Sequence, residues 1–259
     1  MTEPSATLLL PGDPPPFELV NPGGGSTAVL ICDHAANRIP GRLGDLGLAP
    51  GRIEEHIAWD PGAAAVARRL SVLLDAPLVL SGYSRLVVDC NRPPASPQSM
   101  APASAGVPVP ANAEIGAAER AARLAELFHP YHDAVEALLD ERAGRPSLLL
   151  SIHSFTPDIG DGPRPWQVAL AYGRDGRLAR LLLAALRCEP ELTVGDNQPY
   201  AVTDDTDYSI PVHGERRGIP HVLVEMRQDG LREAGGADRW AARLAGAYRA
   251  VEADALALP

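Results

Sequence analysis

The chain has 259 residues, which is enough for one large α/β domain or two small ones with a substantial core. With 46% hydrophobic and 22% charged residues it resembles a soluble globular protein, and its formal net charge of −10 argues against a general nucleic-acid-binding protein. No apolar run approaches the roughly 18 residues of a membrane span, and residues 1–20 lack the basic region of a signal peptide. Three cysteines leave one unpaired, which favours a reducing setting. We therefore expect a cytoplasmic protein with no nucleic-acid or membrane partner.

Strand and helix patterns alternate along the chain. Residues 11–25 are rich in Pro and Gly, so we divide the sequence into an extended N-terminal arm, 1–26, and an α/β domain, 27–259. Such alternation predicts one domain with a mixed, mostly parallel sheet between helices. The expected strands are 27–32, 77–81, 85–89, 147–153, 167–172 and 221–225, and the expected helices are 61–75, 113–142 with a break near Pro130, 175–187 and 236–253.

Two connections in this pattern are unusual. Residues 81–84 separate two expected strands so closely that these strands should pair antiparallel. Residues 91–113 are rich in Pro, Ala and Ser and show no strand or helix pattern. Loops of that length inside a compact domain are usually functional or mobile. We interpret this one as a flap or rim beside the active site, with disorder as the alternative.

Two histidines follow apolar strands. His34 lies in "CDHAANRIP", residues 32–40, and His153 lies in "SIHSFTP", residues 151–157. A single histidine near a strand is more often structural, but two at the carboxyl ends of separate strands can face one crevice. Neutral imidazoles bind Zn²⁺, and a hydrolytic site needs about three protein ligands and a water. Asp60, just before a proline that suits a helix start, is either a helix N-cap or a third metal ligand.

Arginine and asparagine side chains gather in "SRLVVDCNRP", residues 84–93. Alternation along the expected strand places Arg85 and Asp89 on one face. Either these two form a buried pair that joins the sheet to the flap, or the arginines bind a substrate carboxylate, for which guanidinium is well shaped. The candidates for that contact are Arg85, Asn91 and Arg92.

Glu225 ends the apolar strand of "HVLVEMRQD", residues 221–229. A carboxylate at the end of a buried strand is costly unless it is paired, which indicates either a salt bridge to Arg85 or Arg227 or a working residue. Beside a metal-bound water, Glu225 would act as general base and then as proton donor to the leaving amine. The second long polar segment, 195–218, offers further substrate contacts, of which we select Asn197, Tyr208 and His213.

Six short motifs occur in an order that is similar to a known family. They are "DHAANRIP", "HIAWDPGA", "SRLVVDCNRP", "SIHSFTP", "NQPY" and "LVEMRQD", and they extend from about residue 27 to residue 230. Together they resemble the N-formylglutamate amidohydrolase family of histidine degradation and its relatives. The resemblance implies a hydrolase fold similar to that of zinc carboxypeptidases, in the phosphorylase/hydrolase-like class. It also implies metal-assisted cleavage of a formyl or small acyl amide from an acidic amino acid.

The resemblance also assigns roles to individual residues. His34 and His153 match the metal-binding histidines, and Glu225 matches the acid/base carboxylate. The related carboxypeptidase pattern is His-x-x-Glu, whereas this chain has Asn37 at the fourth position, so the candidates for the remaining Zn²⁺ ligand are Asp60 first and Asp33 second. Asn37 then becomes a substrate contact, and Arg85 or His213 stabilises the tetrahedral intermediate. Arg92 and Arg227 are further candidates to hold the carboxylates of a small anionic N-acyl amino acid.

The specific reaction expected is hydrolysis of N-formyl-L-glutamate to formate and L-glutamate. One alternative is a metallo-deacylase or carboxypeptidase-like hydrolase that acts on another N-acyl amino acid or on a peptide. The other is a metal-free relative that binds an acyl amino acid, which the asparagine at position 37 leaves open. A phosphate-binding enzyme is disfavoured, because no P-loop or GxGxxG motif follows an expected strand.

Overall fold

The computed structural model describes residues 7–158, 160 and 162–258. The strands of its main sheet are β1 (Phe17–Val20), β2 (Ala28–Cys32), β3 (Leu78–Ser81), β6 (Leu148–Phe155), β7 (Val168–Ala171), β8 (Val194–Asp196) and β9 (His221–Arg227). Their spatial order is β1-β3-β2-β6-β9-β7-β8. β3, β2, β6 and β9 are parallel, whereas β1 pairs antiparallel with β3 and β7 pairs antiparallel with β9. The expected mixed, mostly parallel sheet is confirmed.

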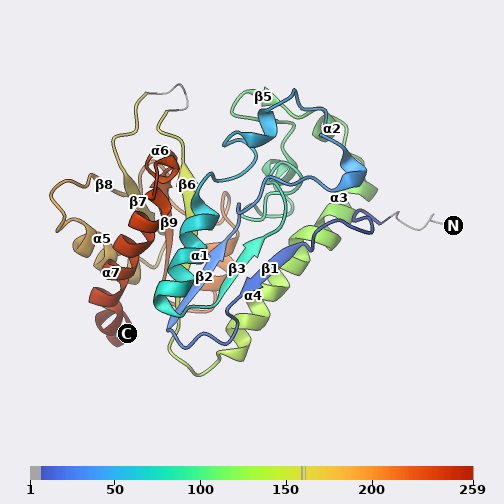
Figure 1. The fold of residues 1–259 in the computed structure, drawn as a ribbon. Coiled ribbons are helices and arrows are strands. Elements are labelled where there is room, and N and C mark those ends of the chain that lie inside the picture. Colours follow the sequence, from blue (N-terminus) through green and yellow to red (C-terminus); the bar gives the residue numbers. More distant parts are fainter. Residues whose placement is uncertain (1–6, 159, 161, 259) are drawn as a thin grey trace.

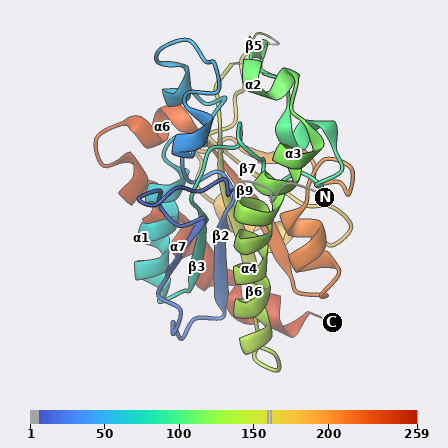
Figure 2. The same cartoon turned by 90° about the vertical axis from the view of Figure 1, so that its right-hand side faces the viewer.

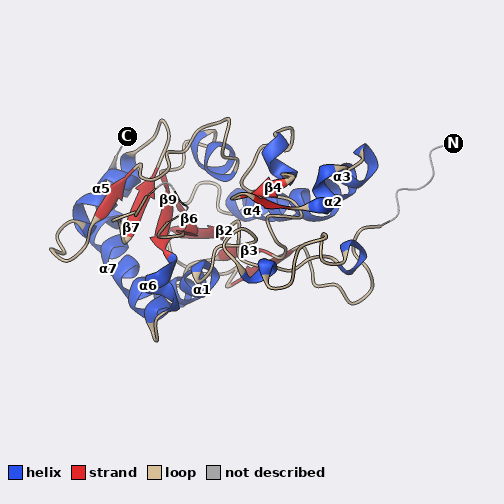
Figure 3. Cartoon of the chain, turned by 90° about the horizontal axis from the view of Figure 1, so that it is seen from above, coloured by secondary structure: helices blue, strands red, loops and turns tan. Residues whose placement is uncertain are grey.

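Helices cover both faces of this sheet (Figures 1 and 3). The helices on one face are α1 (Ala63–Leu74), α5 (Arg177–Leu186), α6 (Gln228–Arg232) and α7 (Gly236–Ala257). The opposite face is covered by α4 (His129–Glu141) and the π-helical turn η5 (Ile210–Glu215). Two short helices, α2 (Pro110–Ala113) and α3 (Ala117–Arg123), lie beyond one end of the sheet with the hairpin β4 (Ala103–Ser104) and β5 (Val107–Pro108), as Figure 2 shows. None of the helices in the described ranges is long and apolar enough to cross a membrane.

Alternation along the central strands separates two cores. In β2, Ala28 and Leu30 pack into the cluster formed with α1 and α7, whereas Val29 and Ile31 pack into the cluster formed with α4. Every residue of β2 is buried, as expected for a parallel strand covered on both faces. The same alternation continues past the end of β2, so Asp33 lies on the α4 face.

The strand expected at 85–89 is wrong. These residues form turns, with the amide of Val87 donating to the carbonyl of Ser84 at 2.9 Å. Their carbonyls are satisfied by buried side chains instead of by a neighbouring strand: Arg123 Nη1 donates to Val87 O at 2.9 Å, and Asn112 Nδ2 donates to Leu86 O at 2.8 Å. The expected antiparallel pairing across 81–84 is therefore wrong as well.

Two other expectations need correction in detail. Residues 91–113 are not structureless, because they contain the turn η3 (Pro97–Met100), the β4–β5 hairpin and α2. The long helix expected at 113–142 begins only at α3 and is interrupted, close to Pro130 as expected, by the π-helical segment η4 (Leu124–Phe128). Pro130 stands in the first turn of α4, where a missing amide proton costs nothing. Short 3₁₀ turns, η1 (Gly41–Leu43) and η2 (Arg52–Glu54), complete the loop after β2.

Candidate active site

Three parallel neighbouring strands end beside one another and carry the central polar residues. His34 follows β2, His153 lies near the end of β6, and Glu225 lies near the end of β9. Because β6 lies between β2 and β9 in the sheet, the carboxyl ends of all three meet. His153 and Glu225 are direct partners in the β6–β9 register, so their side chains leave the same face. The structure therefore brings these three residues together, as the strand-end argument predicts.

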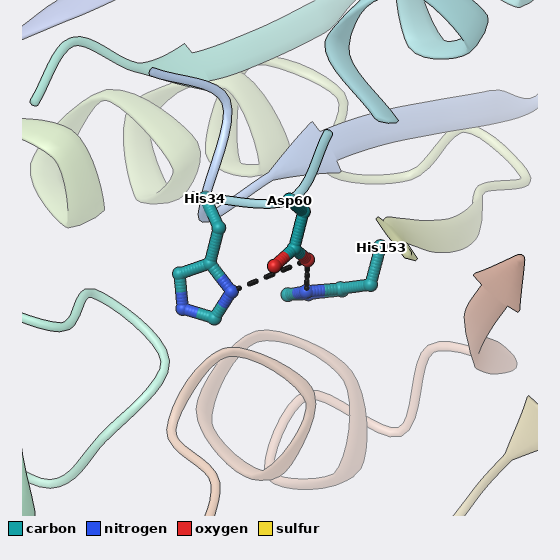
Figure 4. A group of neighbouring side chains, drawn as sticks. All are labelled: His34, Asp60 and His153. Atoms are coloured by element: carbon teal, nitrogen blue, oxygen red, sulfur yellow. Dashed lines mark hydrogen bonds and ion pairs between the residues drawn. The ribbon is translucent and has the colours of Figure 1, made fainter. Parts of the chain in front are cut away.

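Asp60 joins the two histidines in a buried cluster (Figure 4). Its Oδ2 atom lies 2.8 Å from Nδ1 of His153 and 3.4 Å from Nδ1 of His34. One nitrogen or oxygen atom from each of the three residues lies within 4.8 Å of the others, as in a site that could hold a metal ion. The imidazole centroids are 4.9 Å apart at an interplanar angle of 76°, so the two rings meet edge to face.

Asp60 is not a helix cap. The N-cap of α1 is Gly62, with no side-chain capping bond, and the Asp60 carboxylate accepts a hydrogen bond from the amide of Ser154 at 3.2 Å instead. The amide of Asp60 donates to the carbonyl of His34 at 3.0 Å. These two backbone bonds tie the loop before α1 to β6 and to the loop after β2, and they orient the carboxylate toward the histidines.

Each histidine of the cluster has a carboxylate on its other ring nitrogen. His34 Nε2 lies 2.7 Å from Asp89 Oδ1, and His153 Nε2 lies 2.9 Å from Asp33 Oδ2. Because an ionised carboxylate only accepts, both Nε2 atoms donate. Carboxylates behind metal-binding histidines orient the ring and raise its basicity as a ligand. Asp33 and Asp89 are in position to do this for His153 and His34.

Asp33 is itself held by buried partners. Its Oδ1 atom accepts hydrogen bonds from the hydroxyls of Tyr131, on α4, and Ser209. Its Oδ2 atom accepts one from Ser151, at 2.9 Å, besides the one from His153. A fully bonded buried carboxylate has little freedom to rotate. The orientation of His153 is therefore determined by groups from β6, α4 and the segment before η5.

The electrostatics of the cluster favour a cation among the three ligand atoms. With both Nε2 atoms donating, a cation among the three ligand atoms would replace the Nδ1 protons that now face Asp60, and two imidazole lone pairs and a carboxylate oxygen would hold it. Burial alone would raise the pKa of Asp60, but the charges and hydrogen bonds of His34 and His153 outweigh it and hold that pKa far below its usual range. Burial would lower the pKa of His153, yet Asp33 and Asp60 raise it well above the ordinary value. Both shifts show that the site stabilises positive charge.

Glu225 lies beside this cluster without a hydrogen-bond partner. Its side chain is buried, and its Oε2 atom has no partner among the described residues. Burial raises its pKa to about 7, with His153 opposing the shift and Asp60 reinforcing it. A carboxyl group with a pKa near neutrality can both accept and donate a proton at physiological pH. The alternative role for Glu225, a salt bridge to Arg85 or Arg227, does not occur among the contacts of the described residues.

A cavity of about 650 Å³ opens over the cluster and includes Glu225 in its lining. Arg85, Asn91 and Arg92, the predicted carboxylate contacts, also line it. Arg85 is held by Asp89, with Nη2 2.7 Å from Oδ2, and its Nη1 atom lies 3.6 Å from Asp60 Oδ1. The Arg85–Asp89 pair, one of the two alternatives for this segment, therefore exists, and Arg85 also lines the cavity.

Five predicted site residues do not line this cavity. Asn37 donates to Ile53 O and Glu54 Oε2, and Asn197 accepts from the amide of Tyr172. His213 is buried against His132, Tyr208 packs among the rings of Phe128 and His132, and Arg227 pairs with Asp229. The side chains that the structure directs elsewhere are those of Asn37, Asn197, Tyr208, His213 and Arg227.

Some cavity and support residues were not predicted. His56, which we had not selected, lines the cavity and has a buried Nε2 atom that finds no partner among the residues that the structure describes. Tyr131 and Ser209, which hold Asp33, gave no signal in the sequence because hydroxyls are common in helices and loops. Ser151 did give one, as a polar residue inside the apolar run of β6.

Comparison with known proteins agrees with this geometry. The family model for N-formylglutamate amidohydrolase matches residues 26–232. The gene product Atu2144 of Agrobacterium tumefaciens is 35% identical, with a TM-score of 0.89, and the match covers 95% of this chain and 99% of that one. The N-formylglutamate amidohydrolase of Ralstonia eutropha shares the fold, with 21% identity, a TM-score of 0.63 and coverage of 92% and 97%. Among curated proteins, none matches. The chain belongs to the N-formylglutamate amidohydrolase family, whose members are hydrolases acting on carbon–nitrogen bonds other than peptide bonds.

Proposed function

We propose that this protein is a zinc-dependent amidohydrolase that removes a formyl or other small acyl group from the nitrogen of an amino acid. N-formyl-L-glutamate, the substrate named for the family, is the reference substrate. The observation that carries the proposal is the buried His34–Asp60–His153 cluster, which faces the unpaired carboxyl group of Glu225 across one cavity. A metal-free relative that only binds an acyl amino acid would require neither a metal-binding cluster nor an unpaired carboxyl group beside it.

The donor set fits Zn²⁺. His34 and His153 offer Nδ1 atoms and Asp60 offers a carboxylate oxygen, which are ligand types that zinc accepts, and three protein ligands leave a position open for water. Asn37, which replaces the glutamate of the carboxypeptidase pattern, points to residues 53–54, and Asp60 provides the carboxylate in its place. When bound, Zn²⁺ supplies polarisation of the amide carbonyl and a water of lowered pKa.

Glu225 is in place for the proton transfers. With its pKa raised to about 7 by burial, a useful fraction of Glu225 is ionised at neutral pH and can take a proton from the attacking water. The protonated carboxyl group can then deliver that proton to the departing amine nitrogen. Glu225 can carry the proton between these two steps, because its Oε2 atom has no competing hydrogen bond among the described residues.

Arg85 and Arg92 have different tasks in this scheme. Arg85 lies within 3.6 Å of Asp60, which places its guanidinium beside the ligand cluster, where a donor stabilises the negative charge that develops on the amide oxygen. Arg92 and Asn91 also line the cavity and would provide donors for the carboxylate of the substrate.

The test combines metal content with turnover. Protein purified without chelator is analysed for zinc, and release of formate or free amino acid is measured with N-formyl-L-glutamate and a panel of other N-acyl amino acids. We expect about one zinc per chain, activity lost on chelation and restored by Zn²⁺, and both zinc and activity lost in His153→Ala. Stoichiometric zinc without turnover of any N-acyl amino acid would contradict the proposed reaction.

A further inference from the structure

One side of the cavity is lined by apolar side chains. This apolar wall consists of Ala171, Pro199, Ala201, Val202 and Leu223. It is separate from the histidines and Asp60, which belong to other elements. A wall of this kind contacts an apolar part of a ligand, since the few polar groups of a pocket fix orientation while its apolar surface supplies contact area.

The sheet register places this wall directly beside Glu225. Leu223 is two residues before Glu225 in β9, so both side chains leave the same face. Across the antiparallel pairing, Ala171 in β7 is the direct partner of Leu223. The small side chain of Ala171 leaves space that a larger residue at this position would fill.

The wall also adjoins the carboxylate-binding side of the cavity. Thr203 follows Val202 directly, and its amide donates to Asp207 Oδ2 at 3.1 Å. Asp207 Oδ1 accepts from Asn91 Nδ2 at 3.0 Å, and the guanidinium of Arg92 donates to the carbonyl of Thr206. One loop therefore carries Val202 and also positions Asn91 and Arg92. The group held by Arg92 and the group against the wall belong to neighbouring parts of one ligand.

The cationic side chains of the lining, within the described ranges, serve one substrate carboxylate and not two. Arg85 and Arg92 are the lining arginines, and the sequence contains no lysine at any position. Arg85 already faces two carboxylates, Asp89 and Asp60, and Arg92 faces one, Asp207 at 3.8 Å, so these two arginines have little positive charge to spare. Arg164 lies over the ring of Tyr200, 5.1 Å from its centroid, and is not part of the lining. A side-chain carboxylate of glutamate would lie against the apolar wall without a cation, which is costly.

We propose that the amino-acid half of the substrate has an uncharged apolar side chain, of the leucine, methionine or phenylalanine type. Its α-carboxylate lies at Arg92 and Asn91, and its side chain packs on Ala171, Val202 and Leu223. This assignment rests on the proposed function only for the position of the scissile amide near Glu225. Glutamate, the amino acid of the family name, is then a poor fit.

The experiment measures binding separately from turnover. Glu225→Gln protein, with Zn²⁺ added, is titrated calorimetrically with N-formyl-L-leucine, N-formyl-L-glutamate and N-hexanoyl-L-glutamate, and wild-type kcat/KM is measured for all three. We expect N-formyl-L-leucine to bind about tenfold or more tightly than N-formyl-L-glutamate, with a parallel ratio in kcat/KM. Equal or tighter binding of N-formyl-L-glutamate would overturn the assignment. Tighter binding of N-hexanoyl-L-glutamate than of N-formyl-L-leucine would show that the wall contacts the acyl group and not the amino-acid side chain, and this result would also overturn the assignment.

A charged variant tests the wall itself. Ala201 is exposed on the wall, so Ala201→Arg adds a cation there without disturbing the core. We expect this variant to narrow the leucine-to-glutamate binding ratio by about tenfold. Ala118→Arg, at an exposed position of α3, adds the same charge away from the cavity and should leave the ratio unchanged. An unchanged ratio in Ala201→Arg would mean that the wall does not contact the side chain.

The two proposals fail in different ways. A leucine preference in binding, without hydrolysis of any amide, would end the proposed function and leave the apolar-side-chain assignment standing. Hydrolysis of these amides with a preference for the glutamate substrate would support the proposed function and end the apolar-side-chain assignment.

Discussion

The ligand cluster and the apolar wall lie in the same cavity but are built differently. In the cluster every ring nitrogen and carboxylate has a buried partner, and Asp60 is 4% exposed. Much of the wall comes from the irregular segment 199–202, where Tyr200 is 47% exposed. Groups that perform chemistry need fixed geometry, whereas contacts that choose a substrate can be carried by a loop. Changes in the cluster should therefore abolish the reaction, and changes near the wall should redirect it.

The largest effect is expected for Glu225→Gln. Removing the general base should lower kcat by about 10²–10⁴-fold, because the amide has the shape of the carboxyl group and cannot accept the proton. Zinc content, measured by elemental analysis, should stay at the wild-type value because Glu225 is not among the ligand atoms. Loss of zinc together with activity would show that Glu225 belongs to the metal cluster.

A smaller effect is expected behind the histidines. Asp89→Asn weakens the carboxylate that accepts from His34, and such changes typically cost about 10–100-fold in metal affinity or activity. Zinc affinity is measured by competition with a chelator. Asp229→Asn, which alters an exposed partner of Arg227, is the matched control and should bind zinc normally. Equal zinc affinity in the two variants would show that Asp89 does not support metal binding.

On the carboxylate side we expect a change in KM and not in kcat. Arg92→Lys loses the forked geometry of guanidinium, and a hydrogen bond to a charged group contributes about 1.5–3 kcal/mol, so KM should rise about 10–100-fold. Arg52→Lys, in an exposed pair with Glu55, makes the same replacement outside the cavity. A fall in kcat with unchanged KM would instead place Arg92 beside the reacting atoms.

The smallest effect concerns stability and tests how firmly the loop that carries Asp89 and Asn91 is held against the histidines behind it. His132 Nε2 donates to the carbonyl of Cys90, between Asp89 and Asn91, and its Nδ1 accepts from His213. Burial lowers the pKa of His132 to about 4. Burial, together with repulsion from a charged His132, lowers the pKa of His213 to about 3.

As the pH falls, these histidines take up protons near pH 6.5 in the unfolded chain, whereas His132 in the folded chain takes one up only near pH 4. Their contribution to stability is thus present above pH 6.5 and is lost as the pH falls toward 4. We expect the Tm of wild type to fall over this interval, and His213→Gln to fall less steeply, although it is less stable than wild type at pH 8. Parallel curves for the two proteins would show that His213 is not buried in its neutral form.

The sequence alone was enough to predict that His34, His153 and Glu225 lie close together. His34, His153 and Glu225 each follow an apolar run, and in a mostly parallel sheet the ends of such strands meet, so local pattern was sufficient to bring them together. The same reasoning failed for residues 85–89, which alternate like a strand. Their conformation is decided by Asn112 and Arg123, whose contacts with this turn are made only in the folded chain.

Only the tertiary structure decided how each group is used. Asp60 had two possible roles in the sequence, and its bond to His153, 93 residues away, selects one of them. Asp33 is joined to Ser209 across 176 residues, and the apolar wall combines β7, β9 and a distant loop. Local patterns record which faces of strands and helices are buried. Which polar partner completes each buried group depends on contacts between remote segments, and these exist only after the chain has folded.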